Sequence, residues 1–248
     1  REAEAEEDRI LEEAVASGST RKVVTRYMSR LSRRPTALNH YLVGRALYYD
    51  GNVKAAESHL RSALKLQPDF WFANLRLAML ELQRKRYAQA EQHVRVVLRR
   101  NPREPDALKL LAQLLLEGKD WPRAIRVLED LLAQDPANLG VRRNLAFVLM
   151  ETKDWQRAYK ELKVLRGRLP RDPAVRWYHA MALYELGRLK EAAREFEGLV
   201  RIEKRDVRSL DMLRVIYATL EDWKSLQTTL ERMLPLIDDP EVEARVKE

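Results

Sequence analysis

KDWPRA at residues 119–124 and KDWQRA at residues 153–158 differ only at their fourth residue and lie 34 residues apart. That distance is too long for the two segments to share one ordinary helix, and the agreement is too close for coincidence. A fixed spacing of about 20–50 residues is typical of proteins built from repeated structural units. The pair therefore predicts a repeat protein.

Small residues and prolines keep this spacing along most of the chain. In rows of 34 that start at Ala37, positions 8 and 20 are small in five rows, and position 32 is proline in four. Position 8 holds Gly44, Ala78, Ala112, Ala146 and Ala180; position 20 holds Ala56, Ala90, Ala124, Ala158 and Ala192; position 32 holds Pro68, Pro102, Pro136 and Pro170. The fifth row has Lys204 instead of proline, and the sixth departs at all three positions, with Arg214, Leu226 and Asp238.

Each row predicts two helices joined by a tight turn. Apolar residues recur at helical spacing on both sides of the turn, as in Leu108, Leu111 and Leu115 of the third row. Proline at position 32 ends the second helix because it cannot continue the hydrogen-bond ladder. Small side chains at positions 8 and 20 let the paired helices approach closely. In four rows the turn ends on a residue that can cap the second helix, namely Asn52, Asp120, Asp154 or Asp222.

This pattern resembles the tetratricopeptide repeat (TPR) family, whose repeat of about 34 residues contains W-x2-L-G-x2-Y, A-x3-F and P. The first row reads HYLVGRAL, AESHL and P, and the third reads LKLLAQLL, AIRVL and P. The resemblance, to bacterial TPR scaffolds in particular, implies an all-α, right-handed superhelix of about seven helix-turn-helix repeats plus a C-terminal helix. Each repeat should pack mainly on its neighbours.

The rows predict the domain organisation. Residues 1–36 should form a divergent N-terminal pair with helices at 2–16 and 20–32, and residues 239–248 should begin a capping or further helix that contains Val242 and Val246. Between them we expect six repeats, at residues 37–70, 71–104, 105–138, 139–172, 173–206 and 207–238. The three tryptophans that start second helices, Trp121, Trp155 and Trp223, are expected to pack within their own pairs.

Composition limits the classes of function. Hydrophobic residues make up 46% and charged residues 34%, which favours a folded chain over a disordered one, and the absence of Cys excludes disulfides. No apolar run reaches the roughly 18 residues that span a membrane. The chain begins at Arg1 without a signal-like segment, so we expect a fragment or processed form. We expect it to be soluble, in the cytoplasm or the periplasm, or to belong to a larger envelope-associated protein.

Nothing in the sequence predicts catalysis. The four histidines are His40, His59, His93 and His179, and two of them, His59 and His93, occupy position 23 of adjacent rows, one helical layer apart. We interpret them as partly exposed repeat positions. No Gly-rich phosphate loop, HExxH or GxSxG motif is present. We therefore expect no enzyme activity, no catalytic residues, no cofactor and no metal site.

The charge leaves two binding hypotheses open. The chain carries a net charge of +8 although residues 1–13, with seven acids and two bases, contribute −5. A basic protein suits an acidic partner or an anionic polymer such as RNA or an acidic polysaccharide. The basic clusters at residues 84–86 and at Arg99, Arg100 and Arg103 fall on opposite edges of the predicted array. They form no continuous track, which makes nucleic acid the less favoured partner.

The TPR resemblance implies a partner-binding concave face lined by the first helix of each pair, through positions 2, 5, 6, 9, 12 and 13. Arg45, Arg76, Lys109 and Arg143 would form a cationic ladder with little acid beside it. The other expected contacts are Met79, Gln113, Asn144, Phe147, Trp177 and Met181. Chaperone-binding TPR domains hold a C-terminal carboxylate with a clamp of Lys, Asn and Arg, but Ala174 and Tyr178 stand where its last two cations belong.

These residues predict a non-catalytic interaction scaffold. Its partner should be another protein or a peptide segment, acidic or mixed acidic and apolar, held in the concave groove. The alternative is an anionic polymer, RNA or acidic polysaccharide, bound by the basic superhelix. An acidic glycan would fit the second hypothesis.

Overall fold

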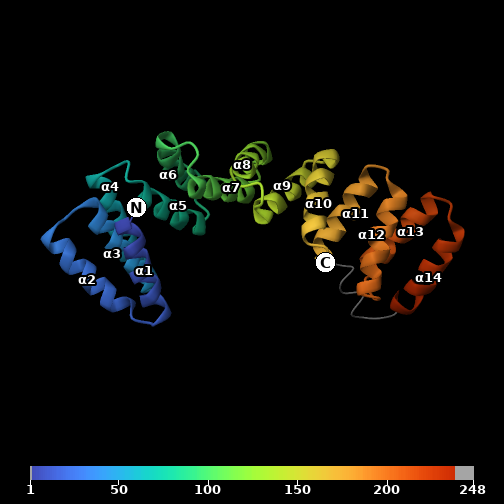
Figure 1. Cartoon of the computed structure of the whole chain (residues 1–248), viewed down its shortest axis with the longest axis horizontal. Coiled ribbons are helices and arrows are strands. Elements are labelled where there is room, and N and C mark those ends of the chain that lie inside the picture. Colours follow the sequence, from blue (N-terminus) through green and yellow to red (C-terminus); the bar gives the residue numbers. More distant parts are fainter. Residues whose placement is uncertain (1, 238–248) are drawn as a thin grey trace. The chain divides into compact units, whose positions relative to one another are not determined.

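The computed structural model describes residues 2–237, and within them the chain forms fourteen α-helices and no strand (Figure 1). The chain is divided into two compact units, residues 1–120 (unit 1) and residues 121–248 (unit 2). Unit 1 contains α1 (Glu2–Ala16), α2 (Thr20–Arg33), α3 (Ala37–Tyr49), α4 (Val53–Leu66), α5 (Trp71–Gln83), α6 (Tyr87–Arg100) and α7 (Pro105–Glu117). Unit 2 contains α8 (Trp121–Gln134), α9 (Leu139–Glu151), α10 (Trp155–Arg168), α11 (Pro173–Glu185), α12 (Leu189–Ile202), α13 (Val207–Thr219) and α14 (Trp223–Ile237).

The helix boundaries repeat with the spacing of the sequence. From α5 onwards, every helix begins 34 residues after its counterpart in the preceding pair. The N-terminal pair lies where the sequence placed it, with α2 one residue longer than expected. These findings confirm the predicted all-α repeat fold. The boundary between the units follows Asp120, inside the repeat predicted at residues 105–138. The helix expected at residues 239–248 lies outside the described residues.

Side-chain caps start several helices at the residues that the sequence singled out. The side chains of Asn52, Asp154 and Asp222 accept hydrogen bonds from backbone N–H groups three residues further on, at 3.2–3.3 Å. Thr36 and Asp172 do the same for first helices of pairs. Each bond satisfies one of the N–H groups that have no partner within the helix. The turns between helices are therefore defined locally.

Close helix contact depends on the small residues of the period. The alanines at position 20, from Ala56 to Ala192, are fully buried. At position 8, Gly44 leaves room for the second helix of its own pair. A Cβ atom there would lie 3.0 Å from the carbonyl oxygen of Ala56 and 3.1 Å from Cγ of Leu60. A larger side chain at Gly44 would therefore force α3 and α4 apart.

Each unit has its own apolar core. In unit 1 it includes Leu11, Tyr27, Leu42, Leu60 and Leu77, so side chains of the N-terminal pair and of the first repeats pack together. In unit 2 the cluster around Phe196, Leu183, Leu210, Leu213 and Ile216 joins α11, α12 and α13. The helices of the last pair, α13 and α14, still pack together although Arg214 replaces the small residue at position 8. Arg214 is half-buried and forms an ion pair with Asp211 at 2.7 Å.

The turn inside every pair requires a left-handed backbone residue. The residue just before the N-cap of the second helix has φ between +55° and +85° in all seven pairs. The backbone N–H after it bonds back to the carbonyl five residues earlier, as from Asn52 to Leu47 at 2.9 Å. Glycine adopts this conformation without steric cost. The left-handed residues are Gly18, Gly51, Lys85, Lys119, Lys153, Gly187 and Glu221.

Replacing a left-handed lysine by glycine should stabilise the protein. We expect Lys85→Gly and Lys153→Gly each to raise the free energy of unfolding by about 0.5–1 kcal/mol, because the Cβ strain of this backbone region is relieved. Urea denaturation followed by circular dichroism measures the change. Lys163→Gly is the matched control, since Lys163 is exposed within α10, and there glycine should cost about 1 kcal/mol. A loss of stability in all three variants would contradict the strain argument.

Candidate functional site

First helices of three successive pairs line a cavity of about 420 Å³ in unit 1, the unit 1 groove. All of its lining residues lie on or at the start of α3, α5 and α7, and none lies on a second helix. The structure places the predicted partner-binding residues of this unit around this one cavity. These are Arg45, Arg76, Met79, Lys109 and Gln113.

Cations outnumber acids in the lining of the unit 1 groove. Arg45 is buried, with 8% of its surface exposed, and Arg76 is half-buried with its guanidinium 5.9 Å from the centre of the Tyr49 ring. Lys109 is exposed and its Nζ lies 3.2 Å from Oδ1 of Asp106. Asp106 is the single acidic residue of the lining, against three cations. The residues that line the groove therefore carry a net positive charge.

Apolar side chains form the rest of the groove. Trp71 and Phe72 open α5 and stack with ring centroids 3.7 Å apart, and Phe72 also packs on the buried ring of Tyr41. Met79 is 45% exposed and faces the same cavity. The sequence analysis did not select Trp71 and Phe72, although two adjacent aromatics at the start of a first helix were a visible signal. The lining of the groove thus combines cationic and apolar side chains.

The cationic residue predicted in unit 2 has an acidic partner. Arg143 is exposed on α9, and its guanidinium donates to Oδ2 of Asp172 at 2.8 Å. The other carboxylate oxygen of Asp172 accepts from the backbone N–H of Val175 and caps α11. Both bonds hold the pKa of Asp172 below its usual value, the backbone bond being the larger cause. Arg143 is thus partly neutralised.

The predicted apolar contacts of unit 2 differ in exposure. Phe147 is 43% exposed and lies edge-on to Trp121, with centroids 6.2 Å apart. Trp177 is half-buried and lies edge-on to the buried ring of Phe196. Met181 is half-buried on the same core, and Asn144 is exposed. Phe147 and Asn144 therefore offer accessible surface, whereas Trp177 also has a packing role in its own unit.

Side chains 19 residues apart form a recurring polar contact within the pairs. Nδ1 of His40 lies 3.2 Å from Nδ1 of His59, and Nδ1 of His93 lies 2.9 Å from Oδ1 of Asn74. Arg142 donates to Glu161, and Nε of Arg176 lies 3.1 Å from Oε2 of Glu195. These contacts join positions 4 and 23 of one repeat. The sequence analysis recognised the shared position of His59 and His93 but missed their partners.

Acidic residues pair with the two arginines of the basic cluster at residues 84–86. Arg84 and Arg61 donate to the carboxylate of Glu57 at 2.8 and 2.7 Å. These hydrogen bonds, with that from Arg84 the larger cause, lower the pKa of Glu57 to about 2. The buried carboxylate of Glu81 is paired with Arg61 and Arg86. This network ties α4 to α5 and pairs both arginines of the turn.

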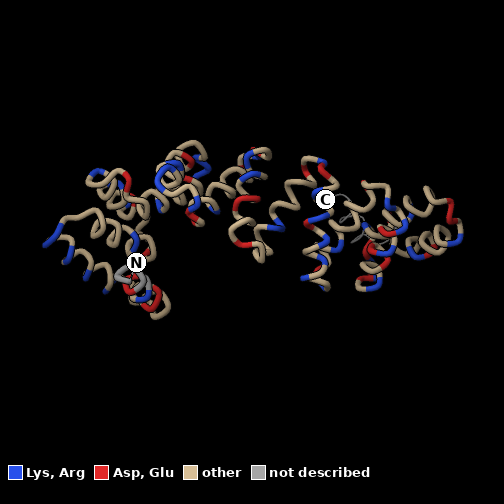
Figure 2. Tube along the Cα trace, turned by 45° about the horizontal axis from the view of Figure 1, so that its top comes forward, with Lys and Arg blue, Asp and Glu red and all other residues tan. Residues whose placement is uncertain are grey.

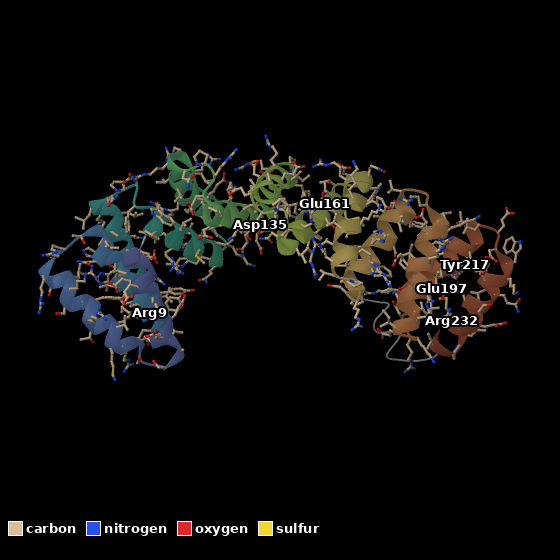
Figure 3. The ribbon with its side chains drawn as sticks, viewed as in Figure 1. Arg9, Asp135, Glu161, Glu197, Tyr217 and Arg232 are labelled. Atoms are coloured by element: carbon tan, nitrogen blue, oxygen red, sulfur yellow. The ribbon has the colours of Figure 1, made fainter. Side chains whose placement is uncertain are left out.

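A second polar cluster joins the last three helices of unit 2. Figure 3 labels its members, Glu197 of α12, Tyr217 of α13 and Arg232 of α14. The Tyr217 hydroxyl donates to Oε1 of Glu197 at 3.5 Å, and Nη1 of Arg232 lies 3.3 Å from Oε2. Burial and the adjacent carboxylate raise the pKa of Tyr217. The cluster ties α12, α13 and α14 together.

Neither a metal cluster nor a membrane span occurs in the part of the chain that the structure describes. Across residues 2–237, no group of three or more His, Cys, Asp or Glu side chains is arranged to hold a metal ion. Within the same residues, each helix is too short or too polar to cross a bilayer. The histidine contacts above are pairs and do not form such a group.

Comparison with known families gives a match in the middle of the chain. A family model described as tetratricopeptide repeat matches residues 47–114 and 115–177, which together exceed half of the sequence. No curated protein matches the sequence. The sequence similarity is thus to a repeat family and not to an individual characterised protein.

Solved structures with a similar fold are repeat proteins of low sequence identity. YrrB, described as a TPR protein with an unusual peptide-binding site, is 16% identical with a TM-score of 0.62, covering 76% of this chain and 97% of its own. A tetratricopeptide repeat protein of Parabacteroides merdae is 13% identical with a TM-score of 0.59, covering 100% and 98%. MamA of Desulfovibrio magneticus is 16% identical with a TM-score of 0.60, covering 71% and 96%. These likenesses concern the fold.

Acid should weaken unit 1 through its histidines. Burial lowers the pKa of His40, His59 and His93, and at 3.2 Å one ring of the His40–His59 pair must donate while the other accepts. As the pH falls through about 6.5, these histidines are therefore protonated in the unfolded chain before they are protonated in the folded protein. We expect the free energy of unfolding to fall between pH 7.5 and the lower folded-state pKa values. Urea denaturation at pH 7.5 and pH 5.5 measures this slope.

His40→Asn provides the control, because it copies the Asn74–His93 contact of the next repeat. The variant should fold because this contact is retained. It should lose less stability on acidification than the wild-type protein, because Asn does not titrate. An unchanged slope would show that the facing imidazoles do not cause the pH dependence.

Proposed function

The chain belongs to the tetratricopeptide repeat family, and we propose that it is a scaffold that binds a segment of a partner protein in the groove lined by its first helices. TPR proteins are in general protein–protein interaction scaffolds. The bound segment is acidic, or mixed acidic and apolar. The proposal assigns the chain no catalytic step and no cofactor.

The composition of the unit 1 groove is the observation that supports this proposal. Arg45, Arg76 and Lys109 surround a cavity that also exposes Trp71 and Met79. Carboxylates of a bound segment would form ion pairs with the cations of the groove. An apolar side chain of the segment would displace water from Trp71 and Phe72. Methionine suits this role because its flexible thioether adapts to different shapes.

Rigidity of the helix pairs supports binding as well. The lining residues stand on helices that buried alanines and capped turns hold in place, so few groove residues need ordering when a partner arrives. YrrB, which shares this fold, is described as having a peptide-binding site, and that is consistent with peptide recognition by such an array. The proposed contacts in unit 2 are Arg143, Asn144, Phe147, Trp177 and Met181.

Binding of an anionic polymer is the competing hypothesis, and the groove favours it less. A polymer needs a track of free cations, whereas Arg84 and Arg86 are paired with Glu57 and Glu81. Arg100 is likewise paired with Asp69 at 2.7 Å. Aromatic side chains such as Trp71 also stack on the bases of RNA, so the apolar lining does not separate the two hypotheses.

Charge reversal in the groove should change which peptides bind. We expect the wild-type protein to enrich acidic–apolar sequences from random peptides displayed on phage. Arg76→Glu/Lys109→Glu should reduce affinity for a selected peptide roughly tenfold or more, because like charges then oppose. Fluorescence anisotropy with the labelled peptide measures the affinity, at low and high salt.

Arg99→Glu/Arg103→Glu is the matched control, since both residues are exposed and neither lines the groove. This variant changes the net charge equally and should keep the peptide affinity. Equal losses in both variants would mean that net charge, and not the groove, governs binding. A wild-type protein that binds poly(U) or heparin but selects no peptide would favour the polymer hypothesis.

A further inference from the structure

The N-terminal part of the chain contains a long stretch without acids. Residues 14–49 include no Asp or Glu, between Glu13 and Asp50. Six of the cations in this stretch lie on α2 or at its C-cap: Arg21, Lys22, Arg26, Arg30, Arg33 and Arg34. Blue positions recur along this helix in Figure 2 with no red between them. We call these six residues the α2 basic face.

The α2 basic face is exposed, and most of it is unpaired. The helix buries Val23 and Tyr27, whereas all six cations are exposed. Arg30 pairs with Glu7 at 2.5 Å, and Arg21 lies 4.0 Å from Asp50. Among the described residues, the other four cations form no ion pair. Their charge is therefore available to a ligand.

Each of the other second helices of unit 1 pairs one arginine with an acid of its own helix. In α4, Arg61 pairs with Glu57, and in α6, Arg95 pairs with Glu91, each four residues earlier. In α2, cations follow one another at the same spacing, as in Lys22, Arg26 and Arg30. Like charges at this spacing destabilise a helix. An anionic surface bound to α2 would offset that repulsion.

The chemistry of the exposed side chains selects the kind of surface. Single-stranded nucleic acid is usually held by aromatic side chains on which bases stack, but the only aromatic residue of α2, Tyr27, is buried and bonded to Glu7. An anionic bilayer instead needs a row of long basic side chains and tolerates an apolar one beside them. Met28, which is 45% exposed on α2, is such an apolar side chain.

We propose that the α2 basic face attaches the protein to anionic phospholipid headgroups. Arg and Lys stems lie along the helix while their charged ends reach the headgroups. No residue that lines the unit 1 groove belongs to α2, so lipid and partner use separate residues. The attachment is peripheral and needs no membrane-spanning helix.

Vesicle binding by the full chain tests the proposal. The wild-type protein should float with mixed phosphatidylglycerol–phosphatidylcholine vesicles at low salt, and should not float with pure phosphatidylcholine vesicles or at high salt. Lys22→Gln/Arg26→Gln/Arg33→Gln removes three cations that form no ion pair. It should lower partitioning into the anionic vesicles by roughly 10- to 100-fold. Circular dichroism and thermal unfolding check that the variant folds.

Lys65→Gln/Lys163→Gln/Lys204→Gln is the matched control, with three exposed lysines from separate elements and the same change of net charge. It should keep most of the vesicle binding. The proposal fails if the wild-type protein does not bind anionic vesicles, or if the two triple variants lose binding equally. It also fails if single-stranded RNA binds through α2 while vesicles do not.

Discussion

Close contact between the two helices of a pair is the constraint on which the remaining structure depends. In the first five repeats it relies on a small residue on each helix where they cross, as Gly44 of α3 and Ala56 of α4 show. With that contact repeated, first helices stand side by side and their free faces line the unit 1 groove. The groove is therefore a consequence of backbone spacing, and its chemistry is set separately by side chains that take no part in the contact.

The repeat, the helix boundaries and several caps could be predicted because they depend on local rules with a fixed spacing. Asn52 and Asp154 show this, since a cap needs only a short polar side chain next to its helix. Long side chains were harder to predict. Lys109 lines the unit 1 groove, but the repeat pattern does not predict its contact with Asp106 or the ion pair of Arg143 with Asp172. The position of a residue in the repeat determines the helix face on which it lies. Its ion-pair partner depends on side-chain rotamers and on neighbours distant in sequence.

Charge in this protein falls into two classes. Many buried or half-buried charges are paired within a repeat or with the next helix, as for Glu81 with Arg61 and Arg86. Removing one partner of such a contact leaves an uncompensated charge, so these residues serve stability. Other cations gather on α2, and in the unit 1 groove cations outnumber acids. The proposal for α2 rests on that difference, because a net positive charge alone does not distinguish a site from ordinary surface.

The contacts between positions 4 and 23 are made inside one pair, yet their chemistry changes from His–His to Asn–His to Arg–Glu along the chain. Whether the side chains at positions 4 and 23 fit each other therefore depends on one helix pair, the hairpin, and not on the whole array. Recombination that exchanges complete hairpins keeps both members together, whereas a crossover within one separates them. The hairpin is thus the natural module for shuffling these repeats in evolution or in protein engineering.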